Sequence, residues 1–367
     1  MTVPFLDLTP QTQAVQYEVL ERLRELMNEN LFIGGETVSE FERYFAEYCG
    51  SAHCVALNSG TDALRFGLAA AGVGPEDEIL TSPLTFIATV EAANQVGRVR
   101  FADVDPGTFN LSIKEVEQKI TKKTRALVPV DLYGLPADLP AFEKIARQRD
   151  LVVVEDACQA HGGAVTGRRT GSFGRCAAFS FYPTKNLSAF GDAGALTTSD
   201  RDLAERVRLL RNHGQTGPYR HESEGGNSRM DAFQAAVLTL KLPHLDRWNQ
   251  ARRERAAYYT ELLADVPEVT PPAVDPHGVH VFHQYVIRAP RRDQLLEHLR
   301  SHGVGARVFY PRPLHLQPCF AELGYREGDL PEAERAAREV LALPLYPELR
   351  AQEQEYVVEK VAEFYRA

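Results

Sequence analysis

The spacing of apolar residues changes after the first two segments of the chain. Residues 11–29 and 37–48 carry apolar side chains three or four positions apart, as Val38 and Phe41 do. This period predicts two amphipathic helices. Beyond them, short runs that are almost wholly apolar alternate with helical segments, which predicts that the two helices precede an α/β unit.

The alternating part predicts a mostly parallel central sheet with helices on both faces. Strands that alternate with helices of this length indicate βαβ units, and strands that are apolar throughout fit a sheet covered on both sides. The predicted strands are residues 53–59, 77–82, 99–105, 125–134 and 151–157. The predicted helices between them are residues 60–73, 86–96, 113–120 and 138–150.

After Asp156 the apolar runs come closer together. The runs at 163–165, 176–181 and 194–199 are expected to join the same sheet as hairpin-connected or antiparallel strands. Residues 231–266 read as long helices.

A smaller α/β unit follows the long helices. It is predicted to contain strands at 284–289 and 306–310, a helix at 292–303 and two final helices. The stretch 269–280 is rich in Pro and Gly and is taken as the boundary. The prediction is therefore a large domain over 1–268 and a small C-terminal domain over 269–367.

Composition narrows the class of protein. Hydrophobic residues make up 44% and charged residues 25% of the chain, and 41 basic against 50 acidic residues give a net charge of −9. This charge argues against a nucleic-acid surface. No apolar run of 18 residues and no secretory signal pattern occur, so a cytoplasmic protein without a membrane span is expected. The five cysteines include no C-x-x-C pair, which favours reduced thiols and no zinc site.

A candidate anion site opens the first helix of the α/β unit. "NSGTDAL" places Ser59, Gly60 and Thr61 at a turn directly after a predicted strand. Free backbone N–H groups at a helix start, with the Thr61 hydroxyl, suit a phosphate. Alternatively, Ser59 or Thr61 only caps the helix. Neither a G-x-G-x-x-G nor a Walker sequence is present, which disfavours a dinucleotide or a nucleoside triphosphate.

A carboxylate stands at the end of the most apolar strand. "VVVEDACQA" ends that strand with Glu155 and Asp156, and an unpaired buried charge there would be very costly. Asp156 could cap the next turn, or it could face a cationic ligand nitrogen. Gln159 could point into the same space.

Lys185 lies in "SFYPTKNL", a turn-prone setting flanked by Pro183, Gly191 and Gly194. A free lysine with a pKa of about 10.4 is protonated at pH 7 and is not a nucleophile. To act as an amine, its pKa must fall by about 3 through burial, a nearby cation or Schiff-base formation. Lys185 is therefore either an ordinary surface charge or an amine kept out of water.

One cofactor accounts for these elements together. Pyridoxal phosphate needs a lysine for its aldehyde, an acid at its ring nitrogen and a phosphate cradle. Phe86, just after the second strand, could supply an aromatic face over the ring, or it could be a core side chain at a helix start.

The same motifs give the chain a family resemblance. It resembles the DegT/DnrJ/StrS family of pyridoxal-phosphate-dependent nucleotide-sugar aminotransferases, which have fold-type I. The resemblance covers nearly the whole chain, and its motifs are "NSGTDAL", "PLTFIAT", "VEDACQAHGG", "SFYPTKNL", "GDAGA", "RNHG", "GGNSRMDAFQAA" and "YPRPLHLQPCF".

The resemblance implies a role for each cofactor residue. Lys185 matches the lysine that forms the Schiff base, Asp156 matches the acid at the pyridine nitrogen, and Gln159 matches the side chain near the ring hydroxyl. The positions that match the phosphate cradle and the stacking ring are Gly60, Thr61, Ser180 and Phe86. Because some related dehydratases replace the lysine by histidine, Lys185 favours amino transfer over dehydration.

The resemblance also implies partners. Asn227 matches a residue that reaches the phosphate of the neighbouring subunit, so a homodimer with shared sites is implied. The family reaction takes an amino group from a donor, here expected to be glutamate, and passes it through pyridoxamine phosphate to a keto sugar on a nucleoside diphosphate.

The substrate residues are less distinct. Arg229, Tyr310 and His315 resemble positions that line the sugar-nucleotide pocket. Arg229 could meet a diphosphate or a uronate carboxylate, or pair with Asp231 or Glu224. His213 could face the pocket or be structural. The "NSR" sequence resembles that of relatives acting on a 3-keto sugar, and amination of a 4-keto sugar is the alternative.

Other functions remain open on sequence grounds. A cysteine desulfurase would need a cysteine on an exposed loop, whereas Cys158 and Cys176 lie next to predicted strands. An amino-acid aminotransferase of the same fold is another possibility. A cofactor-binding regulator would usually carry an extra DNA-binding or membrane segment.

Overall fold

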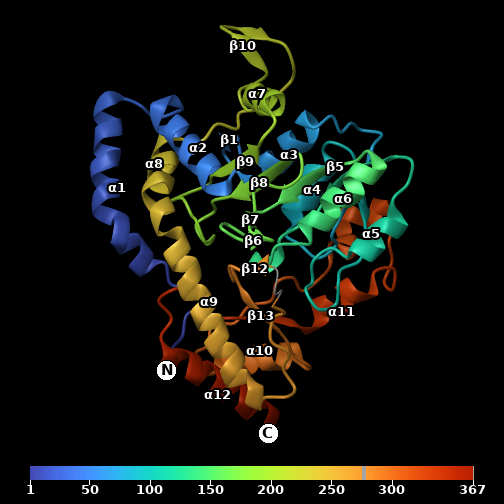
Figure 1. Ribbon diagram of the computed structural model, residues 1–367. Helices are drawn as coiled ribbons and strands as arrows, with labels where there is room; N and C mark the ends of the chain where they lie inside the picture. The colour runs from blue at the N-terminus through green and yellow to red at the C-terminus, as the bar shows by residue number, and fades with distance from the viewer. Residues whose placement is uncertain (275–277, 367) are drawn as a thin grey trace.

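The computed structural model describes residues 1–274 and 278–366, and its centre is a seven-stranded sheet (Figure 1). The strand order is β1 (His53–Leu57), β9 (Gly194–Thr198), β8 (Cys176–Ser180), β5 (Val152–Asp156), β4 (Thr124–Val128), β2 (Glu78–Thr81) and β3 (Arg98–Phe101). Only β9 runs antiparallel to its neighbours, and the other pairs are parallel. The predicted mostly parallel sheet is therefore confirmed.

Helices cover both faces of this sheet, as the alternating pattern predicts. On one face lie α3 (Gly60–Ala70), α4 (Ile87–Asn94) and α7 (Arg201–Leu210). On the other lie α2 (Gly35–Cys49), α5 (Ile113–Lys119), α6 (Leu139–Arg149) and α8 (Ala232–Lys241). Successive strand residues face opposite sides. Val154 therefore packs in the core beside α3, whereas Val153 packs in the core beside α6.

The first predicted helix forms α1 (Thr9–Glu29), which packs on α8 along one side of the molecule (Figure 1). No helix within the described residues is long and apolar enough to cross a membrane.

Two of the close-spaced runs differ from prediction. β8 continues the parallel sheet beside β5, so only the run at 194–199 adds an antiparallel strand. The run at 163–165 does not enter the main sheet. It forms β6 (Ala164–Val165) in a small sheet with β7 (Arg168–Arg169) and β12 (Gly278–Val279), because so short a strand bounded by glycines turns back on itself.

The smaller unit is built on β13 (Tyr285–Arg288) and β14 (Val340–Leu343), which pair antiparallel. Its helices are α10 (Arg292–Ser301), α11 (Pro331–Glu339) and α12 (Ala351–Arg366). The strand predicted at 306–310 is wrong, since only Arg307 bridges to Ala342. The chain there runs into Pro311 and Pro313, which lack the N–H groups that a longer ladder needs.

The remaining elements are short. A hairpin of β10 (Gln215–Gly217) and β11 (Arg220–His221) projects from the body (Figure 1). The 3-10 helices are η1 (Leu132–Gly134), η2 (Leu242–His244), η3 (Leu263–Asp265), η4 (Leu314–Leu316) and η5 (Pro318–Leu323).

Helix α9 (Leu245–Leu262) joins the two units. Leu245 packs in a core of the large sheet, whereas Tyr259 packs in the core of the smaller unit (Figure 1). That second core also contains Val3 from the N-terminus. Of the predicted boundary segment 269–280, residues 275–277 lie outside the described residues. The predicted domain division at 268 stays a prediction.

Gly194 allows the β1–α3 turn to lie directly against β9. A Cβ atom at this position would come within 2.2 Å of the Ser59 carbonyl carbon and 2.5 Å of the Gly60 nitrogen. Gly194→Ala should therefore lower the free energy of unfolding by about 1–3 kcal/mol or more, measured by denaturant unfolding. Gly217→Ala is the matched control, because its Cβ would meet no atom within 4 Å. Equal stability of both variants would contradict this close approach.

Candidate active site

A cavity of about 1110 Å³ lies at the carboxyl ends of the parallel strands, where ligands of open α/β sheets bind. Its walls come from both units, because β5 and β8 supply one side and the segment around residue 310 supplies the other. Eight of the predicted site residues line this cavity: Gly60, Thr61, Phe86, Asp156, Gln159, Ser180, Lys185 and Tyr310.

Asp156 is the last residue of β5 and its side chain is buried. The Thr89 hydroxyl of α4 donates a hydrogen bond of 2.7 Å to Oδ2, and the Cys158 backbone N–H lies 3.3 Å from Oδ1. Thr85 lies 2.9 Å from the Thr89 hydroxyl, which completes a short chain of hydroxyl groups. Asp156 does accept a bond at the following turn, yet it also lines the cavity, so both roles proposed for it are compatible.

Gln159 connects the large sheet to the opposite wall. Its Oε1 accepts a hydrogen bond of 2.7 Å from the Tyr133 backbone N–H, and its Nε2 lies 3.2 Å from the Tyr310 hydroxyl. The Tyr133 hydroxyl in turn donates to the Phe309 carbonyl oxygen. These contacts hold Tyr310 over the cavity, and burial raises the pKa of its hydroxyl.

Lys185 lies in the turn that follows β8 and is half-buried in the cavity wall. Its backbone N–H donates to the Tyr182 carbonyl oxygen at 2.8 Å, which shapes the turn. Burial lowers the pKa of the Lys185 amine, although the nearby Cys158 and Asp156 act in the opposite direction. This direction fits the expectation of an amine held away from bulk water.

The turn before α3 is shaped for close approach. Ser59 is the N-cap residue, and its hydroxyl accepts a 3.2 Å bond from the Asp62 N–H. A Cβ atom on Gly60 would lie 2.8 Å from both Cys158 Sγ and Ser180 Cβ, so only glycine fits there. Since Ser59 provides the cap, the Thr61 hydroxyl at the cavity wall is left available for a ligand.

Phe86 is not a core side chain. It precedes α4, is 55% exposed, and lines the cavity with its ring centroid 6.3 Å from that of Tyr310. An exposed aromatic ring beside a buried carboxylate provides an apolar face for a flat ligand.

Three predicted residues lie outside this cavity wall. His315 is buried and its Nε2 lies 3.1 Å from Glu334, which makes it a structural side chain in this arrangement. Arg229 donates to Asn212 at 2.8 Å rather than pairing with Asp231 or Glu224. Asn227 is exposed, its backbone carbonyl oxygen accepts from Asn58 Nδ2, and its backbone bridges to Asn212.

His213 does not line the cavity either. Its carbonyl oxygen lies 2.9 Å from His221 Nδ1, and its own φ of +59° places it in the left-handed region, so its visible role is to shape the turn.

Sequence reasoning missed three residues of the site. Thr89 lies one helical turn after Thr85 in "PLTFIAT", and that spacing was the signal in the sequence that could have identified it.

The other two missed residues are Arg307 and Arg312, which line the cavity and are exposed. Neither forms an ion pair within residues 1–274 and 278–366. They leave uncompensated positive charge at this wall, which suits an anionic ligand.

The cysteines do not fit a desulfurase. Cys158 lines the cavity, but burial and the Asp156 charge raise the pKa of its thiol. A reactive cysteine requires the opposite shift. Cys319 is exposed but does not line the cavity.

On the other face of the sheet, Glu155 and Asp131 form a buried acidic pair. Two contacts of 3.0 and 3.1 Å from the Gly171 N–H engage the Glu155 carboxylate, and Asp131 Oδ1 accepts from the Ala137 N–H at 2.9 Å. Burial raises the pKa of Glu155 to about 7, and burial together with the Glu155 charge raises the pKa of Asp131. The pair therefore retains a proton that the unfolded chain would release.

This pair makes stability depend on pH. An ordinary Glu pKa is about 4.3, so between that pH and about 7 the native state binds more protons than the unfolded state. The free energy of unfolding should fall as the pH rises through this window, by at most about 1.4 kcal/mol per pH unit for one proton. Asp131→Asn should flatten this slope, because the amide imitates the protonated acid.

Denaturant unfolding at several pH values measures the slope. Asp150→Asn is the control, because the Asp150 side chain is fully exposed and should leave the slope unchanged. If Asp131→Asn kept the wild-type slope, the proton would have to reside elsewhere.

A mostly parallel sheet with helices on both faces, and a cavity that contains a lysine and a buried acid at its carboxyl edge, defines the fold-type I class of pyridoxal-phosphate enzymes. The chain belongs to the DegT/DnrJ/EryC1/StrS aminotransferase family, whose model matches residues 13–362. It is thus an aminotransferase by family, as the motifs predict.

Of the known proteins that are similar over the whole chain, one is named as a regulator and another as a sugar transaminase. A pleiotropic regulatory protein of Geobacillus stearothermophilus is 49% identical, with 100% of this chain and 99% of that protein covered. The dTDP-3-amino-3,4,6-trideoxy-alpha-D-glucose transaminase of Streptomyces venezuelae is 42% identical, with 99% and 96% covered. The crystal structure of S. venezuelae DesV superposes with a TM-score of 0.97 at 42% identity, covering 100% of this chain and 99% of DesV.

Proposed function

We propose that this protein transfers an amino group from glutamate to a keto sugar carried on a nucleoside diphosphate, with pyridoxal phosphate as cofactor and a 3-keto sugar as acceptor. The observation that carries the proposal is the placement of Lys185 and Asp156 on one cavity beside the α3 N-terminus. Amination of a 4-keto sugar is the alternative acceptor chemistry. The product would serve surface polysaccharide or secondary-metabolite synthesis in the cytoplasm.

The residues present fit the cofactor. Gly60 leaves space that a Cβ would fill, at a helix start where unpaired N–H groups favour a phosphate. Thr61 and Ser180 line the same wall, and Phe86 offers an exposed ring. Pyridoxal phosphate supplies an electron-accepting ring that eases the breaking of a C–H bond next to the bound nitrogen.

Asp156 would hold a positive charge at the ring nitrogen. Because it is buried, an ionic hydrogen bond there is strong. Thr89 donates to one carboxylate oxygen and leaves the other oriented by the Cys158 N–H. The hydroxyl thus fixes the orientation of the carboxylate.

Lys185 would tether the cofactor and then move protons. Its lowered pKa allows the free Nζ to take a proton from the amino donor and to return it, which is general base and acid catalysis. In the second half-reaction, Nζ would carry the proton in the opposite direction. Arginine could not replace it, because the guanidinium does not release its proton near neutral pH.

The cavity supports a large anionic substrate. Its volume of about 1110 Å³ exceeds the upper end of the usual 300–1,000 Å³ range for small-molecule sites. The uncompensated charges of Arg307 and Arg312 suit a diphosphate. Tyr310 lies on the same wall and could contact the sugar, while Arg229 and His315 would reach a substrate only after rearrangement or in a neighbouring subunit.

The preference for a 3-keto sugar is supported by relatives rather than by "NSR". The S. venezuelae relative is named for a sugar with its amino group at position 3. Ser228, the middle residue of "NSR", is buried and donates to Asn58 Oδ1 at 2.8 Å. Its side chain therefore shapes the turn and does not read the sugar.

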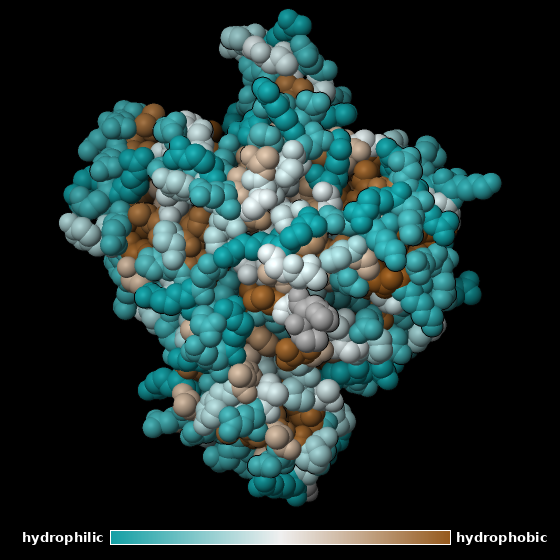
Figure 2. Space-filling view, viewed as in Figure 1, coloured by the Kyte–Doolittle hydropathy of each residue, from teal (hydrophilic) through white to brown (hydrophobic). Residues whose placement is uncertain are grey.

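A homodimer with shared sites accounts for features that one chain leaves unexplained. Asn227 is exposed and away from the cavity wall, and Tyr219 is 95% exposed at the tip of the projecting β10–β11 hairpin (Figure 1). Along α1, Tyr17 and Leu20 are exposed as well, and Figure 2 shows hydrophobic surface on that side of the molecule. Burial of such surface in a second copy would be favourable.

A regulatory function without catalysis is the second candidate, because the G. stearothermophilus relative is named as a regulator. Such a protein could keep the cofactor site. Turnover by the purified protein separates it from the enzyme.

Removing the Lys185 amine tests the catalytic assignment. Lys185→Ala should fold, dimerise and bind pyridoxamine phosphate, but its turnover should fall by a factor of roughly 10² to 10⁴ or more. Lys144→Ala, on an exposed position of α6, is the control and should keep full turnover. Binding by absorbance and turnover by product analysis are the two measurements. Ordinary turnover by Lys185→Ala would refute the role of this lysine.

The acceptor is tested by paired assays. With glutamate as donor, a 3-keto nucleotide sugar should be aminated at a kcat/KM at least about tenfold above that of the 4-keto isomer, a difference of about 1.4 kcal/mol. Mass spectrometry and NMR of the products identify the amination site. A reversed preference would establish the 4-keto alternative, and no turnover with either sugar would favour the regulatory candidate.

A further inference from the structure

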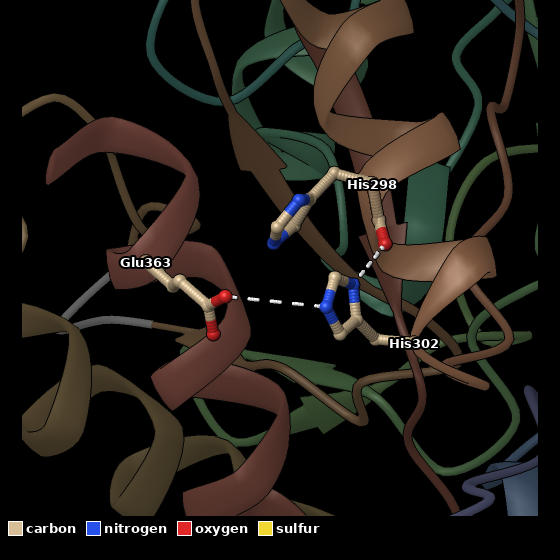
Figure 3. A group of neighbouring side chains, drawn as sticks. All are labelled: His298, His302 and Glu363. Atoms are coloured by element: carbon tan, nitrogen blue, oxygen red, sulfur yellow. Dashed lines mark hydrogen bonds and ion pairs between the residues drawn. The ribbon is translucent and has the colours of Figure 1, made fainter. Parts of the chain in front are cut away.

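Two histidines and a glutamate converge in the smaller unit. His298 and His302 lie four residues apart on α10 and just beyond its end, and Glu363 projects toward them from α12 (Figure 3). Their ligating atoms all lie within 4.8 Å of one another. Neither helix contributes a residue to the wall of the catalytic cavity, so the cluster is a separate feature.

Hydrogen bonding fixes the tautomer of His302. Its Nδ1 lies 2.8 Å from the His298 carbonyl oxygen, which can only accept, so Nδ1 carries the proton (Figure 3). In the neutral ring, Nε2 is then an acceptor that faces Glu363 Oε1 at 4.0 Å. Two acceptors face each other at this point, and a cation between them would satisfy both.

The second histidine, His298, has a ring nitrogen that can accept a bond but has no partner in the part of the chain that the structure describes. His298 Nε2 is buried and has no hydrogen-bond partner within the described residues. The ring packs against His302 at 4.3 Å and against Phe364 at 5.6 Å between centroids, which restricts its orientation. A metal-ligating histidine usually has one ring nitrogen bonded to a backbone or carboxylate oxygen and the other free for the metal. His302 has this arrangement, with Nδ1 bonded to the His298 carbonyl oxygen.

We propose that His298, His302 and Glu363 bind a divalent transition-metal ion, for which Zn²⁺ is the best match. Two imidazoles and one carboxylate are a known zinc ligand set, with a fourth position left for water. Bonds of about 2.0–2.1 Å place tetrahedral ligand atoms about 3.4 Å apart, so the side chains must close by roughly 1 Å. Glu363 is exposed and can rotate to do so.

Lys360 modulates this site. Its ammonium group lies 2.7 Å from Glu363 Oε2 and 2.9 Å from Glu359, so it engages the carboxylate oxygen that does not face the histidines. It competes for the charge of Glu363 and should weaken metal binding. The bound ion would connect α10 to α12, the helix that ends the described chain, and would stabilise the smaller unit by binding only the folded state.

Two measurements on the cofactor-loaded protein test the proposal. Isothermal titration calorimetry with ZnCl₂ measures binding, and thermal unfolding with and without ZnCl₂ measures the stabilisation. The wild type should bind one Zn²⁺ per chain at this site, with a rise in the thermal midpoint. His302→Gln and Glu363→Gln should each weaken binding roughly tenfold or more, whereas Lys360→Met should strengthen it several-fold. His221→Gln, an exposed histidine outside the cluster, is the control and should bind as the wild type does.

A second readout keeps the test independent of stability and activity. Co²⁺ should give the visible absorption of a four-coordinate site in the wild type and lose it in His298→Gln. The metal-free thermal midpoints of the variants establish that each is folded. Zn²⁺ binding that is absent from the wild type, or unchanged in His298→Gln and His302→Gln, would overturn the proposal, since a protonated His302 paired with Glu363 would then explain the cluster.

Discussion

The burial of a single carboxylate at the end of β5 is the constraint on which the site depends. Asp156 is held out of water by the sheet and would be costly there without partners. The Thr89 hydroxyl and a backbone N–H supply part of the compensation, and the cavity offers room for a cationic ring nitrogen to supply the rest. Burial also lowers the pKa of Lys185, so one cavity wall holds a buried carboxylate close to an amine that releases its proton more readily.

The alternation of side chains along β5 places two adjacent acids in different environments. Glu155 and Asp156 are neighbours in sequence, yet their side chains leave opposite faces of β5. Glu155 faces Asp131 in the closed interior and shares a retained proton with it, whereas Asp156 faces the cavity. Adjacent carboxyl groups thus serve stability and ligand binding without sharing an environment.

Much of this architecture could be predicted from sequence, because the spacing of apolar residues and the short motifs depend only on residues that are close together in the chain. The parallel sheet and the residues Lys185, Asp156 and Gly60 follow from apolar runs that end in polar residues at fixed places. Contacts between distant segments could not be predicted in this way. His315 lies within a substrate-like motif, yet Glu334 engages it in the interior.

The cluster proposed as a metal site could not be predicted from cysteine spacing, because His298 and Glu363 come from helices that only the tertiary fold brings together. Thr89 was missed because its partner, Asp156, lies on another element.

Helix α9 determines how the molecule can deform. Asn249 donates to the His161 carbonyl oxygen in the large unit, and three residues later the buried Arg252 donates to carbonyl oxygens that include those of Phe282 and Leu345. These polar contacts lie within one turn of α9, and the helix also packs in a core of the large sheet at Leu245 and in the core of the smaller unit at Tyr259. Swinging one unit away from the other would require bending this helix or breaking buried contacts. Substrate entry and product release should therefore rely on small movements of side chains and loops at the cavity rim, with the two halves of the chain keeping a fixed relative orientation.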